Sequence, residues 1–333
     1  MLKALIVGEA WGEREALEGK PFAGASGHIL RGLLDQTGWA RGEYRLTNVF
    51  NEQPADNKIE SFTTTETALG VTSFPHFKPR HYVRKDKFHH VERLIEEVKL
   101  YAPTIIIALG STPLWALAHR QGVAKWRGSP MSSAYGPKLI CTWAPSAILR
   151  QWDLRPVAFM DLLKARREAE FPEVRRPERF IILEPTLEDI ETFYHEHVVP
   201  ASRLSVDIET KSGQITEIGF ATSPSRALVI PFYSRSRINY WPSVTAELTA
   251  WKWVRRFLAE KPTIGQNFQY DMQYLWRTLG IPCPRFEGDT MLLHHALQPE
   301  LKKGLGFLGS IYTDEPAWKF MRSDNATLKK EDE

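Results

Sequence analysis

Cysteine is scarce in this sequence. Only Cys141 and Cys283 occur among 333 residues, and they lie far apart. A disulfide framework, a four-cysteine zinc site and a four-cysteine iron–sulfur cluster are therefore excluded by number alone. We expect no iron–sulfur cofactor.

Long apolar runs are also missing. No run approaches the roughly 18 apolar residues that a membrane-spanning helix needs. The first residues, MLKALIVGE, contain a short apolar run without a small-residue cleavage site, which predicts a first strand instead of a signal peptide. We therefore expect a cytoplasmic protein with no membrane partner.

The net charge is small for a chain of this size. The sequence has 43 Lys and Arg residues against 40 Asp and Glu residues, which leaves +3. This balance excludes a histone-like polycation and a long acidic tail. At about 150 residues per domain, the length predicts two domains.

The first half alternates apolar strand patterns with helical ones. The run Thr104–Leu109 is apolar on both faces, as in a central parallel strand. Further strands are predicted at Ala4–Val7, Tyr44–Val49 and Leu139–Trp143. Because helical patterns separate these strands, we predict an α/β domain over residues 1–165, with a parallel sheet covered on both sides in three layers.

A change of composition separates the two halves. Residues 166–179 are rich in arginine, contain Pro172 and Pro177, and predict a basic linker. The second domain is then expected over residues 180–333. Its predicted elements are a helix at Leu187–Val198, an antiparallel meander formed by Leu204–Ile208, Ile215–Ala221 and Ala227–Pro231, and later helices at Val244–Ala259, Met272–Leu279 and Thr290–Leu297.

Two acids stand close together on the first strand of the meander. Asp207 and Glu209 are two residues apart, so strand geometry places both on one face. Neighbouring carboxylates repel each other and need a solvated surface or a bound cation. This spacing alone is typical of an ordinary exposed strand end. A second segment, TIGQNFQYD at residues 263–271, changes that interpretation because it runs from a short strand into a helix.

With these two motifs in order, the second half resembles the proofreading-type 3′–5′ exonuclease domain of DNA polymerase I, one of the DEDD exonucleases, over roughly residues 180–312. The resemblance implies an RNase H-like mixed sheet and a site for two Mg²⁺ or Mn²⁺ ions that hydrolyses phosphodiesters. It also implies that Asp207 bridges both ions, Glu209 holds the ion that activates water, and Asp271 completes the other. Asn267 and Tyr270 are the implied substrate-binding residues.

The third motif of that family is missing. It consists of Tyr or His, then three residues, then a fourth Asp. The later acids here are Asp289, Asp314, Asp324 and Asp332. The residues four positions before them are Arg285, Ser310, Phe320 and Leu328, so none has the required Tyr or His. Three interpretations stay open: a truncated chain, a site completed by a DNA polymerase or another chain, or a domain that is not a competent nuclease.

Three motifs in the first half form a second resemblance. GEAWGE at residues 8–13 follows the first strand, GKPFAGASG occupies residues 19–27, and LTNV occupies residues 46–49. Together they resemble the uracil-DNA glycosylase superfamily from about residue 1 to residue 150. The resemblance implies that Glu9 handles the attacking water, Phe22 stacks on an extruded base, and Asn48 reads the edge of that base.

This first half also departs from the family pattern. The late family motif starts with His-Pro-Ser, but here Ala144 precedes Pro145 and Ser146. Alanine cannot stabilise negative charge on a uracil oxygen, and losing one such donor costs about 2.7–4 kcal/mol. Trp11 stands where the family has Pro and is expected to crowd the pocket. We therefore expect weak excision at best.

The resulting prediction is a two-domain protein that processes DNA, acting on single strands or 3′ ends. A glycosylase-like domain of doubtful activity precedes a metal-dependent 3′–5′ exonuclease domain. The alternative is a non-enzymatic DNA-binding accessory, or a replication or repair scaffold, in which both sites are degenerate.

Overall fold

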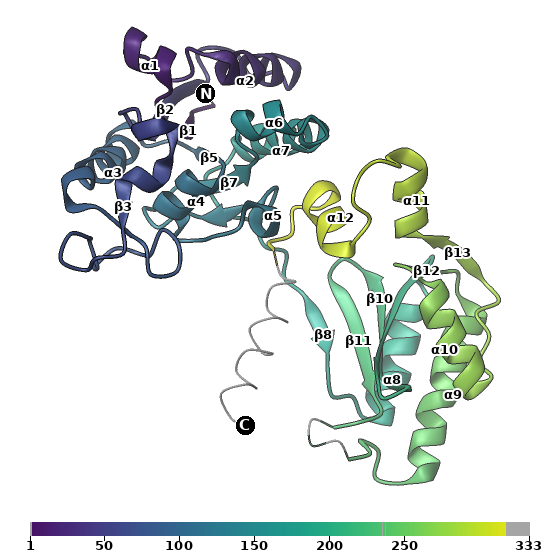
Figure 1. Cartoon of the computed structure of the whole chain (residues 1–333). Coiled ribbons are helices and arrows are strands. Elements are labelled where there is room, and N and C mark those ends of the chain that lie inside the picture. Colours follow the sequence, from purple (N-terminus) through teal and green to yellow (C-terminus); the bar gives the residue numbers. More distant parts are fainter. Residues whose placement is uncertain (1, 235, 237, 318–333) are drawn as a thin grey trace. The chain divides into compact units, whose positions relative to one another are not determined.

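The chain folds into two compact units (Figure 1). The computed structural model describes residues 2–234, 236 and 238–317. The first unit contains residues 1–175 and the segment from Gly306 onward, and the second contains residues 176–305. These limits differ from the predicted ones, because helix α7 runs through Glu168 and because the end of the described chain belongs to the first unit. In the described part of the chain, every helix is too short or too polar to cross a membrane.

The first unit alternates strands and helices as its sequence pattern predicts. Its elements are β1 (Ala4–Ala10), α1 (Glu13–Glu18), α2 (Ala25–Gln36), β2 (Tyr44–Phe50), β3 (Thr63–Thr64), β4 (Tyr82–Val83), α3 (His89–Tyr101), β5 (Ile105–Leu109), α4 (Ser111–Ala118), α5 (Val123–Trp126), β6 (Met131–Ser132), β7 (Lys138–Thr142), α6 (Pro145–Arg150), α7 (Leu154–Glu168) and α12 (Leu305–Tyr312).

The main sheet of this unit has the strand order β2-β1-β5-β7-β6. The first four strands are parallel, and the short β6 pairs antiparallel with β7. Alternate residues of one strand enter different cores: Ile106 packs in one cluster with Leu94 of α3, and Ile107 packs in another with Leu33 of α2. Helices therefore cover both faces, and the predicted three-layer α/β domain is confirmed (Figure 1).

The second unit is built on a mixed sheet. Its elements are β8 (Phe180–Ile182), α8 (Leu187–Phe193), β9 (Leu204–Lys211), β10 (Gln214–Ser223), β11 (Arg226–Pro231), α9 (Val244–Glu260), β12 (Thr263–Gly265), α10 (Gln269–Leu279), β13 (Phe286–Asp289) and α11 (Thr290–Leu297).

The six strands follow the order β13-β12-β9-β10-β11-β8. The predicted antiparallel meander β9-β10-β11 is confirmed, and the flanking pairs are parallel. Val206 and Ile208 of β9 enter the core with Phe257 of α9, whereas Asp207 between them is exposed. The period-2 pattern therefore places the acids of β9 on the face opposite the core.

Helix α3 offers a matched pair for testing the first core. Leu94 is fully buried and Leu100 is 86% exposed. We expect Leu94→Ala to lower the free energy of unfolding of the first unit by about 2–5 kcal/mol, because it removes packed methyl groups and leaves a cavity. Leu100→Ala should change it by less than about 0.5 kcal/mol. Denaturant titration measures both, and equal effects would contradict the assigned core.

Candidate functional site

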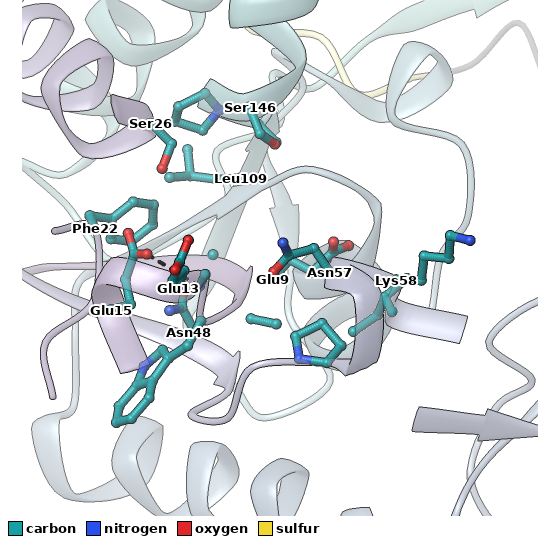
Figure 2. A pocket seen from close by; sticks show the side chains of 18 of the residues that line it. Glu9, Glu13, Glu15, Phe22, Ser26, Asn48, Asn57, Lys58, Leu109 and Ser146 are labelled. Carbon is teal, nitrogen blue, oxygen red and sulfur yellow. Dashed lines mark hydrogen bonds between the residues drawn. The ribbon is translucent and has the colours of Figure 1, made fainter. Parts of the chain in front are cut away.

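A pocket of the first unit lies at the carboxyl ends of its parallel strands. It has a volume of about 500 Å³ and is lined by Gly8 of β1, Asn48 of β2, Leu109 at the end of β5 and Ala144 after β7. Figure 2 shows Glu9, Phe22 and Asn48 around it. Open α/β sheets bind ligands at this edge because the strand ends and following loops converge there.

Asn48 and Phe22 meet at the floor of the pocket. Gly8 pairs with Asn48 across the parallel strands, and a Cβ on Gly8 would lie 2.3 Å from Asn48 Oδ1 and 2.6 Å from Phe22 Cζ. Asn48 is only 2% exposed and lines the pocket. An amide at a pocket wall carries both a hydrogen-bond donor and an acceptor, so it can pair with a polar ligand.

The backbone of Asn48 is held from behind by Arg93 of α3. The guanidinium donates to the carbonyl oxygens of Asn48 and, at 3.1 Å, Val49. Nη1 of the same guanidinium donates to Glu97 Oε2 at 2.7 Å, and the Thr47 hydroxyl donates to that oxygen at 2.9 Å. Sequence reasoning missed Arg93, which fixes the end of β2 and hence the direction of the Asn48 amide.

Phe22 adopts an unusual backbone conformation. Its φ of 58° lies in the left-handed region, which bulky residues rarely occupy. Arg31 Nη1 donates to the Phe22 carbonyl oxygen at 3.0 Å, and a Cβ on Gly27 would lie only 1.8 Å from that oxygen. Arg31 and Gly27 therefore hold the turn that places the aromatic ring in the pocket wall.

Glu9 extends from β1 into the same pocket and accepts a hydrogen bond from Thr112 Oγ1 of α4. Although its side chain is exposed to the pocket, the surrounding protein atoms raise the pKa of the carboxyl above its usual range. The Thr112 hydrogen bond works in the opposite direction and lowers that pKa. Burial therefore outweighs the Thr112 hydrogen bond in setting the pKa of this carboxyl group.

Glu15 ties the first two sequence motifs together and was also missed by sequence reasoning. One carboxylate oxygen accepts from Gly12 N at 3.2 Å, and the other accepts from Gly24 N at 3.0 Å. The spacing Gly12-x-x-Glu15 places an acid at the third position of α1, which is a recognisable capping signal. This bridge brings the loop after β1 next to the loop that carries Phe22.

Trp11 and Ala144 both line the pocket, as their substitutions for family residues predict. Ala144 is the residue before α6, and a Cβ on Gly110 would lie 3.1 Å from the Ala144 Cβ. Its methyl group offers no hydrogen-bond donor to the cavity. The Trp11 indole nitrogen is buried without a partner among the described residues.

Asp207 and Asp271, two of the predicted acids of the second unit, lie near each other where the pairing of β9 with β12 ends. Strand β12 pairs with β9 only at Leu204 and Ser205, so the edge of β9 beyond them is uncovered. Asp271 of α10 fills the next position by accepting from Ile208 N at 2.8 Å. Burial, with repulsion from Asp207 as a smaller cause, raises the pKa of Asp271 to about 7.

Asp289 supports this arrangement through backbone hydrogen bonds, and its charge is a minor cause of the raised pKa of Asp271. Its carboxylate accepts from the backbone nitrogens of Asn267 at 3.0 Å, Phe268 at 2.8 Å and Met291 at 2.8 Å. Asn267 has a φ of 55°, so its turn needs such support. Asp289 therefore positions the start of α10 at Gln269, three residues before Met272, where the sequence pattern predicted that helix to begin.

The other predicted residues are less closely gathered. Tyr270 is partly exposed and hydrogen-bonds Thr210 at 2.6 Å. Glu209 follows Asp207 on the same face of β9. In residues 2–317, apart from 235 and 237, no group of three or more His, Cys, Asp or Glu side chains is placed to hold a metal ion. Asp207, Glu209 and Asp271 thus fit a metal centre only in part, and Asp324 and Asp332 lie outside the described residues.

An α/β domain whose sheet edge brings an aromatic ring, an amide and a carboxyl group into one pocket can stack on and hydrogen-bond a flat polar ligand. The chain belongs to the uracil DNA glycosylase superfamily, whose family model matches residues 1–167. It is 29% identical over 168 residues to a type-4 uracil-DNA glycosylase of Thermotoga maritima, covering 49% of this chain and 76% of that protein. It is 30% identical over 162 residues to one of Pyrobaculum aerophilum, covering 46% and 71%.

The resemblance predicted from the three motifs of the first half is therefore confirmed. Among solved structures, the chain is similar to the EXO domain of Nibbler from Aedes aegypti, with a TM-score of 0.32 and 12% identity over 44% of this chain and 73% of that one. This value is too low to support an argument. The exonuclease resemblance of the second unit stays a prediction.

The hydrogen bond between Thr112 and Glu9 can be tested directly. We expect Thr112→Val to raise the pKa of Glu9 further, because the charged carboxylate loses a donor while its burial is unchanged. NMR titration of the Glu9 side-chain carbon measures this shift. Thr104→Val serves as a control, since Thr104 bonds the Lys3 carbonyl and not Glu9. An unaltered Glu9 pKa in Thr112→Val would contradict the assigned contact.

Proposed function

We propose that the first unit binds a base extruded from DNA, with uracil as the preferred base, and excises it slowly. The observation that carries this function is the pairing of Asn48 and Phe22 in the pocket, where both side chains lie within 2.6 Å of the position that a Cβ on Gly8 would occupy. An amide can pair with the donor and acceptor edge of a base while an aromatic ring stacks on its face. The named activity of the type-4 relatives supports uracil in DNA as the substrate.

Each pocket residue has a role that suits its chemistry. Glu9 orients water toward the sugar carbon, Phe22 stacks on the base, and Asn48 selects its edge. The weak step is charge stabilisation on the leaving base, because Ala144 offers no donor. Binding should therefore be retained more fully than cleavage.

Phe22→Ala tests base recognition. Stacking contributes about 1–3 kcal/mol per base, so the variant should bind uracil-containing single strands about 5- to 150-fold more weakly. Fluorescence anisotropy with matched strands that have or lack uracil measures the loss. Tyr101→Ala is the control, because Tyr101 contacts Lys3 and Arg45. These residues lie at the amino ends of β1 and β2, whereas the pocket lies at the carboxyl ends. Equal uracil affinity in Phe22→Ala and the parent would refute the base pocket.

Ala144→His tests the missing donor. Removing such a donor elsewhere lowers turnover about 100- to 1,000-fold, so restoring one should raise uracil release by up to about 100-fold. Ala144→Phe has similar bulk without an N–H group and should give no gain. Release of free uracil from a labelled strand measures the rate. If the histidine and phenylalanine variants behave alike, the donor is not what limits excision.

A second function is favoured by the acids of the second unit. We propose that Asp207, Glu209 and Asp271 form part of a 3′–5′ exonuclease site for Mg²⁺ or Mn²⁺. The raised pKa of Asp271, caused by burial and then by Asp207, is expected where two carboxylates meet without a cation. When bound, divalent ions would stabilise charge on the phosphodiester. A fourth carboxylate from a DNA polymerase or another chain would complete the ligand set.

Replacing the acids tests this second function. We expect the parent to shorten 5′-labelled single strands slowly with Mn²⁺, and Asp207→Ala and Asp271→Ala to abolish the shortening because each removes a carboxylate ligand. Gel analysis of the products follows the loss of 3′ nucleotides. Glu188→Ala, an exposed acid on α8, should leave the rate unchanged. Unchanged rates in both acidic-site variants would remove the nuclease assignment.

A further inference from the structure

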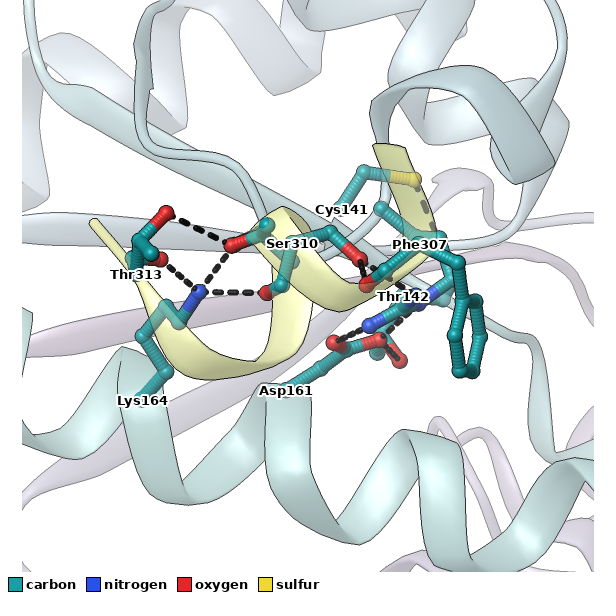
Figure 3. Close-up of polar contacts among 10 residues, drawn as sticks. Cys141, Thr142, Asp161, Lys164, Phe307, Ser310 and Thr313 are labelled. Atoms are coloured by element: carbon teal, nitrogen blue, oxygen red, sulfur yellow. Dashed lines mark hydrogen bonds and ion pairs between the residues drawn. The ribbon is translucent and has the colours of Figure 1, made fainter. Parts of the chain in front are cut away.

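The last helix of the described chain belongs to the first unit. Helix α12 follows the second unit, and the described residues from Gly306 to 317 group with residues 2–175. Figure 3 shows Ser310 and Thr313 hydrogen-bonded to Lys164 of α7, and beside them Asp161 of α7, which is hydrogen-bonded to Thr142 at the end of β7. We call these contacts, together with Arg127, the α12 seat.

Lys164 is the centre of the seat. It is 2% exposed, and its ammonium group donates to three carbonyl oxygens: Gly128 at 2.8 Å, Thr313 at 2.6 Å, and Ser310. A lysine has three hydrogens to donate, so its capacity is filled. Two of the acceptors come from the end of α12, where helix carbonyls lack partners and carry partial negative charge. Without α12, Lys164 would keep one of these acceptors.

Arg127 forms the second half of the seat. It is 3% exposed, makes a two-point contact with Asp161, and donates to Ser310 Oγ at 2.8 Å. Its guanidinium also lies 5.3 Å from the centre of the Phe307 ring. Asp161 accepts from Thr142 at 2.7 Å as well. Arg127 is thus paired with a hydrogen-bonded carboxylate, the same carboxylate acts on Lys164 electrostatically, and oxygens of α12 supply further acceptors to both cations.

The backbone at Gly128 shows how closely α12 approaches. A Cβ at this position would lie 2.7 Å from the Ser310 carbonyl oxygen and 2.6 Å from Asp161 Oδ1. The chain that leaves the first unit is tied down too, since buried Lys138 donates to Glu168 at 2.7 Å and to the Glu173 carbonyl at 3.0 Å. Both segments that connect to the second unit are therefore anchored in the first.

We propose that the second unit is inserted into the first, and that α12 is an integral helix of the first unit which stays bound when its covalent link to the second unit is cut. The partner of the α12 seat is thus residues 306–313 of this chain. The seat recognises the end of α12 through two buried cations: Lys164 donates to the carbonyl oxygens of Ser310 and Thr313, and Arg127 donates to the Ser310 hydroxyl.

Cleavage of the full chain tests this inference. A site for a specific protease is introduced between Lys303 and Gly304, next to the start of α12. After cleavage, we expect the fragment that begins at Gly304 to co-elute with the rest of the chain on native size exclusion. Immediate separation of the parent fragment would overturn the inference.

Variants on both sides of the seat complete the test. Lys164→Met should weaken retention at least about tenfold, because it removes hydrogen bonds from a charged donor. Ser310→Ala lies on the fragment, leaves the body of the unit unchanged, and should weaken retention about tenfold through Arg127. Arg167→Met is the control, because its 3.8 Å pair with Asp314 is exposed on both sides. Retention like the parent in both Lys164→Met and Ser310→Ala would also overturn it.

Discussion

The amide of Asn48 and the ring of Phe22 approach each other over the Cα of Gly8, and the pocket of the first unit depends on this contact. The parallel register places Gly8 beside Asn48, and a single added carbon would lie within 2.6 Å of both side chains. Such a carbon would displace the stacking ring and the amide together. Because Gly8 has no side chain, the Phe22 ring and the Asn48 amide can both reach the same part of the pocket and contact one ligand.

Both candidate sites contain a backbone turn that costs energy and is held by a polar side chain. Phe22 and Asn267 have left-handed φ values of 58° and 55°. Such residues cost of order 1–3 kcal/mol each and persist where the surroundings over-determine them. Arg31 holds the first turn by donating to the Phe22 carbonyl oxygen. Asp289 holds the second turn by accepting from the Asn267 N–H group. In each unit, a charged residue outside the predicted motif thus sets the position of a residue inside it.

Buried charges in the two units have different surroundings. Lys164 and Arg127 find oxygen partners for their hydrogens, so they stabilise the packing of α12. Asp271 accepts an N–H group but lies near Asp207, and burial with that repulsion raises its pKa to about 7. Burial also lowers the pKa of Lys164 to about 8, so the two groups differ less in the cost of their charge than in their neighbours: Lys164 donates to oxygen acceptors, whereas Asp271 faces a like charge.

The sequence by itself determined the local features of this protein. The β-branched run at β5, the alternation on β9 and the three motifs around Glu9, Phe22 and Asn48 predicted the α/β class, the meander and the family, because period and motif spacing are local properties. Only the tertiary structure decided that Arg93, Arg31, Glu15 and Thr112 support the pocket and that α12 returns to the first unit. Those contacts join residues far apart along the chain or on different elements, and they depend on register and packing, which no periodicity in the sequence encodes.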